Sequence, residues 1–178
     1  MIKKSSTFLL FAATMMAWAV VGIPLAAQAG PGGHPDLTGQ WQLNRSQSDD
    51  PQAKFGSMGS GGGHHGGGGG PLEEIRRAMM NAPARLVMAH DDQKVVLTEP
   101  DGHVRTLPTN NRQVKIDGRE VRTTWEGNRL ISETAMGGTK LVETYERSPD
   151  GKHLVVTVGT EMHGQQMSIR RVYARASQ

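Results

Sequence analysis

The sequence contains no cysteine and few aromatic side chains. Its 178 residues include three tryptophans, two tyrosines and three phenylalanines. The lack of cysteine excludes disulfide bonds, thiol catalysis and thiolate metal sites, so packing and hydrogen bonds alone must hold the fold. Common catalytic motifs are also absent, because no Gly-x-Ser-x-Gly, Ser-x-x-Lys, His-Glu-x-x-His or phosphate-binding loop occurs. We therefore do not expect an enzyme.

The first 29 residues have the pattern of a secretory signal. Lys3 and Lys4 precede an uncharged apolar run, residues 8–21, and a break at 22–24 is followed by small residues up to Ala29. An uncleaved membrane anchor fits less well, because a spanning helix needs about 20 apolar residues. We expect cleavage after Ala29, a periplasmic or secreted protein, and no stable membrane insertion afterwards.

Charge of one sign does not accumulate in the chain. The formal charge is +3 at pH 7. Without the two lysines of the predicted signal, 18 basic side chains face 17 acidic ones, which leaves +1. Because basic and acidic residues are interspersed, the composition argues against nucleic acid as a partner.

A glycine-rich stretch interrupts the sequence early. Residues 55–70 are almost entirely Gly, Ser and His, which predicts a flexible loop. His64 and His65, with His34, are candidates for a weak metal site, but their spacing fits no tetrahedral set. We expect no metal and no cofactor there. Residues 71–82 then predict a short helix, with proline at its first position and acids in its first turn.

After Pro83 the hydrophobic period changes from that of a helix to that of a strand. Nine alternating runs follow, separated by turn sequences such as Asp-Gly at 117–118 and Gly-Asn at 127–128. With a strand at Leu37–Asn44 this makes ten. An open sheet of that size exposes its edges, so we predict an all-β, antiparallel up-and-down barrel whose first strand pairs with its last. Residues 30–36 would be a tail and residues 37–178 one domain, with the loop and the helix inserted after the first strand.

Gly39-Gln40-Trp41 matches the Gly-x-Trp of the first strand in the calycins, the lipocalins and fatty-acid-binding proteins. The resemblance covers about residues 37–175. It implies that Trp41 closes the barrel base, with Arg171 or Arg175 packed over it. The strand number and the closing "RVY" resemble the fatty-acid-binding branch, which implies that Arg171 and Tyr173 hold a ligand carboxylate.

Two departures weaken that comparison. The fatty-acid-binding branch has a pair of helices where this sequence predicts one helix and a glycine-rich loop, and its members are cytosolic. The opening strand also resembles small exported bacterial proteins of the Gly-x-Trp type with unassigned function.

Arg171 is the residue on which the functional hypotheses depend. Alternation places it on the same, more apolar face of the last strand as Tyr173, which should point inward. An inward arginine needs a partner. It would bind a ligand carboxylate, with Tyr173 adding a hydrogen bond, or it would cap the indole of Trp41. Trp125 would be a core or rim residue, or would stack on a ligand.

Two functions remain open at this point. The first is binding of a small apolar or amphipathic ligand by Arg171, Tyr173 and Trp125, with Gly39, Trp41 and Arg175 as structural barrel-closing residues. The second is a structural or interaction protein of the cell envelope with a filled barrel and no small-molecule ligand. The sequence does not determine the oligomeric state.

Overall fold

The computed structural model describes residues 30–55, 70–162 and 164–176. Most of them form ten strands. These are β1 (Gly39–Asn44), β2 (Arg85–His90), β3 (Lys94–Thr98), β4 (Val104–Pro108), β5 (Gln113–Ile116), β6 (Arg119–Glu126), β7 (Arg129–Met136), β8 (Thr139–Arg147), β9 (His153–Met162) and β10 (Gln165–Arg175). The predicted signal and most of the predicted glycine-rich loop lie outside the described residues and stay predictions.

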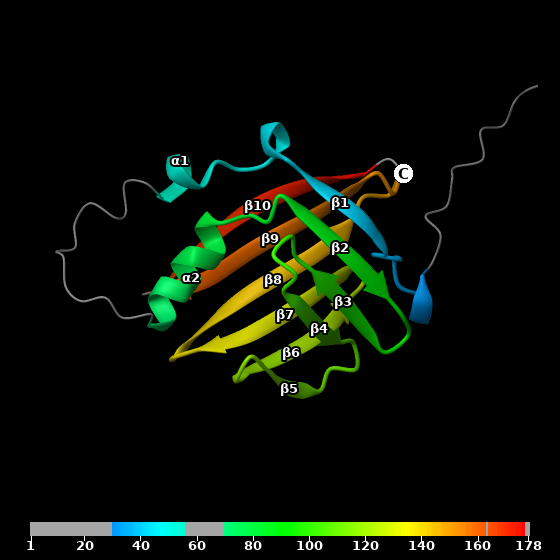
Figure 1. Ribbon diagram of the computed structural model, residues 1–178. Helices are drawn as coiled ribbons and strands as arrows, with labels where there is room; N and C mark the ends of the chain where they lie inside the picture. Colours follow the sequence, from blue (N-terminus) through cyan, green and yellow to red (C-terminus); the bar gives the residue numbers. More distant parts are fainter. Residues whose placement is uncertain (1–29, 56–69, 163, 177–178) are drawn as a thin grey trace, which may run out of the picture.

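The strands form one antiparallel sheet that wraps into a nearly closed barrel (Figure 1). The order is β4-β3-β2-β1-β10-β9-β8-β7-β6-β5. β1 pairs with β10, with Trp41 opposite Arg175 and Leu43 opposite Tyr173. The predicted all-β, ten-stranded up-and-down barrel is therefore confirmed, together with the pairing of its first and last strands.

The barrel is not hydrogen-bonded all the way round. β4 and β5 follow each other in sequence but stand at opposite ends of the strand order, so they do not pair. The turn-like residues 108–111 thus connect two strands that are not paired and do not form a hairpin. β4 ends at Pro108, which has no amide hydrogen to donate, and Asn111 in the following connection adopts a φ of 58°.

Buried and more exposed side chains alternate along the strands, as the hydrophobic pattern of the sequence predicts. On β8, the side chains of Leu141, Glu143 and Tyr145 are buried, whereas those between them are more exposed. The Asp117–Gly118 turn between β5 and β6 has positive φ at both residues, 51° and 77°, as a two-residue hairpin of that type requires. Turn chemistry and strand period agree along most of the chain, which sets the register.

The predicted short helix between β1 and β2 is confirmed as α2 (Pro71–Met80). Among the described residues, a short turn of 3-10 helix (Arg45–Gln47) and a five-residue helix, α1 (Pro51–Phe55), precede it. Five residues are too few to show an apolar stripe, so α1 left no signal in the sequence.

Helix α2 covers one end of the barrel (Figure 1). Ile75 and Met79 are 1% and 3% exposed and join the core, whereas Leu72 is 59% exposed. Glu74 forms an ion pair with Arg119 at the start of β6. The helix is therefore fastened to the barrel by one apolar stripe and one charged contact.

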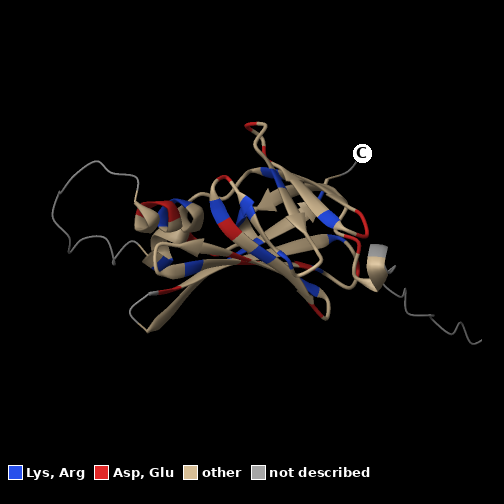
Figure 2. Ribbon diagram, turned by 90° about the horizontal axis from the view of Figure 1, so that it is seen from below, with Lys and Arg blue, Asp and Glu red and all other residues tan. Residues whose placement is uncertain are grey.

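The opposite end holds the N-terminal segment, as the blue chain in Figure 1 shows. Charged side chains of both signs are interspersed over the described ribbon (Figure 2). No helix within the described ranges is long and apolar enough to span a membrane.

Candidate functional site

Arg175 packs over Trp41 across the paired strands β1 and β10. Trp41 is fully buried and its indole nitrogen donates to the Leu37 carbonyl at 3.1 Å. The Arg175 guanidinium carbon lies 5.4 Å from the indole centroid, and its Nη2 donates to the Thr38 carbonyl at 3.0 Å. A Cβ at Gly39, where φ is 154°, would stand 3.3 Å from that same Nη2. Arg175, not Arg171, therefore lies over Trp41.

Arg171 points into the barrel and has a different partner. It is 6% exposed, and its Nη2 donates to the carbonyls of Ala78 and Met79, the latter at 3.1 Å. Those carbonyls belong to the last turn of α2, which lacks partners within the helix and carries the negative end of the helix dipole. The sequence left a ligand or Trp41 as partners for Arg171, and the structure places it on a helix terminus.

The charge of Arg171 is compensated by dipoles. Within the described part of the chain it has no carboxylate hydrogen-bond partner, and its Nε is buried without one of any kind. Burial lowers the pKa of Arg171, as expected for a cation removed from water. An anion beside this guanidinium would meet a largely desolvated positive charge.

Tyr173 lies one layer deeper on the same face of β10. Its side chain is fully buried. Burial raises the pKa of the Tyr173 phenol to about 12, so the hydroxyl keeps its proton at neutral pH and remains a donor. Arg171 and Tyr173 therefore share one face of β10. That they hold a ligand stays a prediction.

A pocket of about 590 Å³ opens beside Arg171, between β1, β10 and the ends of α1 and α2. Leu43, Met80 and Ile169 supply its apolar surface, and Arg171 its buried charge. Its remaining lining residues surround the mouth and are Arg45, Ser48, Asp49, Asp50, Pro51, Asn81 and Ala82.

The two acids at the pocket mouth are already engaged. Asp49 pairs with Lys54 at 2.6 Å and accepts the Arg170 amide at 2.8 Å, and the Lys54 hydrogen bond lowers the pKa of that carboxyl. Asp50 accepts the Gln52 amide at 2.9 Å at the start of α1. Both carboxylates therefore already have donors of the chain, whereas the buried Arg171 Nε has no partner among the described residues.

Trp125 belongs to the other end of the barrel. Its ring stacks on His34 with centroids 4.5 Å apart, and His90 lies tilted at 5.5 Å. Burial lowers the pKa of His90. Trp125 is thus a half-buried residue near the N-terminal segment and does not line the Arg171 pocket. No cluster of three potential metal ligands occurs among the described residues.

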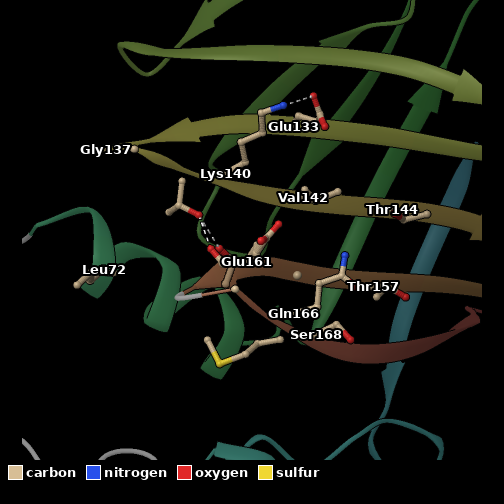
Figure 3. Close-up of a pocket in the computed structure, with 16 residues that line it drawn as sticks. Leu72, Glu133, Gly137, Lys140, Val142, Thr144, Thr157, Glu161, Gln166 and Ser168 are labelled. Atoms are coloured by element: carbon tan, nitrogen blue, oxygen red, sulfur yellow. Dashed lines mark hydrogen bonds and ion pairs between the residues drawn. The ribbon is translucent and has the colours of Figure 1, made fainter.

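A second concavity lies on the outer face of the barrel, over β7 to β10 (Figure 3). It encloses about 1060 Å³ and is lined by Val142, Thr144, Thr157 and Ser168, among others. Lys140 pairs with Glu133 at 3.2 Å across its side. This groove is open and presents no buried charge, so it offers less for a small ligand than the pocket at Arg171.

A charged pair that the sequence pattern did not predict lies inside the barrel. Arg105 on β4 reaches Glu143 on β8 through two hydrogen bonds of 2.6 and 3.2 Å and donates to the Tyr145 hydroxyl at 3.1 Å. Alternation contained the signal, because Glu143 falls on the same face as Leu141 and Tyr145, and Arg105 on that of Leu107.

Comparison with solved structures places this geometry among calycin-like barrels. The wild-type fluorescent protein UnaG matches with a TM-score of 0.51 and 16% identity, over 79% of this chain and 97% of that one. Secretory abundant heat soluble protein 4 from Ramazzottius varieornatus matches at 0.50 and 15%, over 79% and 94%. A zebrafish ileal bile acid-binding protein complexed with cholic acid matches at 0.49 and 13%, over 78% and 98%.

The fold is that of the fatty-acid-binding and calycin-like barrels. No protein-family model matches the sequence, and a comparison with curated proteins finds no match. At these identities the likeness shows the fold alone, so the function must be argued from the residues of this barrel.

Proposed function

We propose that this protein is a binding protein for a small amphipathic carboxylate, held in the pocket at the C-terminal end of α2. The observation that carries the proposal is Arg171, a buried guanidinium at the pocket with backbone carbonyls as its partners and a free Nε. A carboxylate forms strong, charge-assisted hydrogen bonds with arginine. The apolar side chains of Leu43, Met80 and Ile169 suit the tail of such a molecule.

We further propose that the protein acts in the periplasm or outside the cell. The support is the order of features in residues 1–29, with two lysines, an apolar run and a small-residue cleavage site. Amino-terminal sequencing of the protein recovered from culture medium and periplasm tests this, with Gly30 as the expected first residue.

The ligand proposal is tested by native mass spectrometry and titration. The mature protein is purified from its own compartment, sprayed intact and extracted with solvent, then titrated with lauric acid and a panel of fatty acids and retinoids. We expect an acidic adduct of the wild type, and binding of lauric acid that Arg171→Met weakens about 10- to 100-fold, the range for a lost charge-assisted hydrogen bond.

Arg122→Met is the matched control. Arg122 is an exposed arginine on β6 and does not line the pocket, so the control removes the same charge and leaves the pocket intact. Arg171→Lys keeps the charge without the bidentate geometry and should restore part of the binding. A spectrum without adducts, together with no binding from the panel, would overturn the proposal and direct attention to the outer groove of Figure 3.

A further inference from the structure

A row of polar side chains crosses the interior of the barrel. Thr123 on β6 lies opposite Ser132 on β7, and Ser132 lies opposite Glu143 on β8. The three side chains are 0%, 1% and 7% exposed. Their neighbours on the same face are apolar, such as Val121 and Leu130.

Two members of this row have no hydrogen-bond partner. Thr123 Oγ1 and Ser132 Oγ are buried, and neither meets a donor or acceptor of the described chain. A buried hydroxyl without a partner is destabilising, and native proteins rarely retain two side by side without a role. Valine and alanine would fill the same positions without that cost.

The register of the two strands sets the geometry of the hydroxyl pair. Residues directly opposite on antiparallel strands have Cβ atoms about 5 Å apart. One oxygen or nitrogen atom placed between them reaches both hydroxyls at about 2.8 Å. Thr123 and Ser132 are thus spaced to hold one shared polar atom.

The charged side chains beside this row limit which chemical group can bind to Thr123 and Ser132. Both oxygens of Glu143 accept from Arg105, and Glu99 lies 3.9 Å from the same guanidinium, so the positive charge beside the row is already compensated. A further anion placed there would lack a counter-charge, and burying it would be costly. A neutral group that both donates and accepts hydrogen bonds suits two hydroxyls, each of which can do either.

We propose that Thr123 and Ser132 form a buried subsite for a neutral hydrogen-bonding group of the ligand, an alcohol or an amide. The subsite rests on the proposed function, because the acid of the same ligand would lie at Arg171. Glu143 is aligned through Val158 with Ile169, which lines the Arg171 pocket. With strands about 4.8 Å apart, Ser132 lies roughly 14 Å from Ile169 along the curved sheet, so the two polar groups of the ligand are separated by no more than about that distance.

The test compares ω-hydroxylauric acid with lauric acid by isothermal titration calorimetry. We expect the wild type to bind the hydroxylated acid about tenfold more tightly, the effect of one or two net hydrogen bonds. The double variant Thr123→Val with Ser132→Ala should reduce that ratio to about one and leave the affinity for lauric acid within about twofold.

Thr144→Val is the matched control, because Thr144 lies on the outer groove and loses the same hydroxyl. A wild type that binds lauric acid through Arg171 with no preference for the hydroxylated form would overturn the subsite and leave the proposed function standing. So would a preference that persists in the double variant. If neither acid binds the wild type, the proposed function fails and the subsite with it.

Thermal unfolding of the unliganded double variant separates a ligand subsite from a site for buried water only. Removing two unpartnered hydroxyls should leave the melting temperature unchanged or raise it. A clear fall in melting temperature, without a hydroxyl preference in the wild type, would show that the hydroxyls hold structural water, which overturns the subsite.

Discussion

Two arginines inside this barrel, the partly buried Arg105 and the buried Arg171, have their charges compensated in different ways. Arg105 pairs with the carboxylate of Glu143, whereas Arg171 binds carbonyls at the end of α2. A carboxylate neutralises a guanidinium fully, while carbonyl dipoles do so only in part. Among the described residues, the difference marks Arg171 as the site where an external anion has most to contribute.

The Arg105–Glu143 pair yields a prediction for stability. Glu143→Ala leaves Arg105 with only the more distant carboxylate of Glu99, 3.9 Å away, and we expect a loss of about 3 kcal/mol in the free energy of unfolding, the lower end of the range for broken buried pairs. The lower end applies because the Arg105 side chain keeps 21% exposure. Urea unfolding measures the loss.

The double variant Arg105→Met with Glu143→Leu is the control for that prediction. Because it removes both charges, we expect it to regain most of the stability lost in Glu143→Ala. If Glu143→Ala alone unfolds at the wild-type urea midpoint, the pair contributes nothing to stability and its partial exposure must be sufficient to solvate Arg105.

Helix α2 is the element that joins the barrel core to the candidate site. Its Ile75 is buried in the core, and its last carbonyls bind Arg171. We expect Ile75→Ala to cost about 3 kcal/mol in unfolding free energy, within the range for large-to-small core changes. Leu72→Ala on the same helix should change it by less than about 0.5 kcal/mol, since Leu72 is exposed.

Chemical denaturation of both variants checks this prediction, and lauric acid titration extends it. Because α2 positions the carbonyls that hold Arg171, a helix loosened by Ile75→Ala should also bind the acid more weakly. Equal stability losses for Ile75→Ala and Leu72→Ala would mean that α2 does not dock through the face seen here.

At the scale of the secondary-structure element, the sequence predicted which face of a strand is buried, but it did not predict how α2 packs against the strands. Alternation placed Arg171 and Tyr173 inward, because the side-chain period of a strand is local information. It did not show that Arg171 meets α2, since the position of a helix end depends on tertiary packing. The Trp41 partner stayed open for the same reason, because Arg171 and Arg175 share one face of β10.

At the scale of the whole molecule, the strands of the barrel are paired continuously except between β4 and β5. Strands β8, β9 and β10 are long, and β8 and β9 are paired on both sides over most of their length. β4 and β5 have only five and four residues and do not pair with each other. The turn residues between them did not reveal this, because whether two consecutive strands pair depends on the rest of the barrel and is not encoded in a four-residue connection.

This interruption makes a prediction for hydrogen exchange of the full chain. β4 and β5 each lack a partner strand on one side, and unpaired amides exchange more readily. We therefore expect peptides covering β4 and β5 to exchange faster than peptides covering the other strands, and peptides covering β8 and β9 to exchange slowest. Mass spectrometry of peptic fragments measures the order, with the β1–β10 pair as an internal reference for a closed seam. Protection of β4 and β5 equal to that of β8 would contradict the gap, because it requires hydrogen bonds that would close the barrel completely.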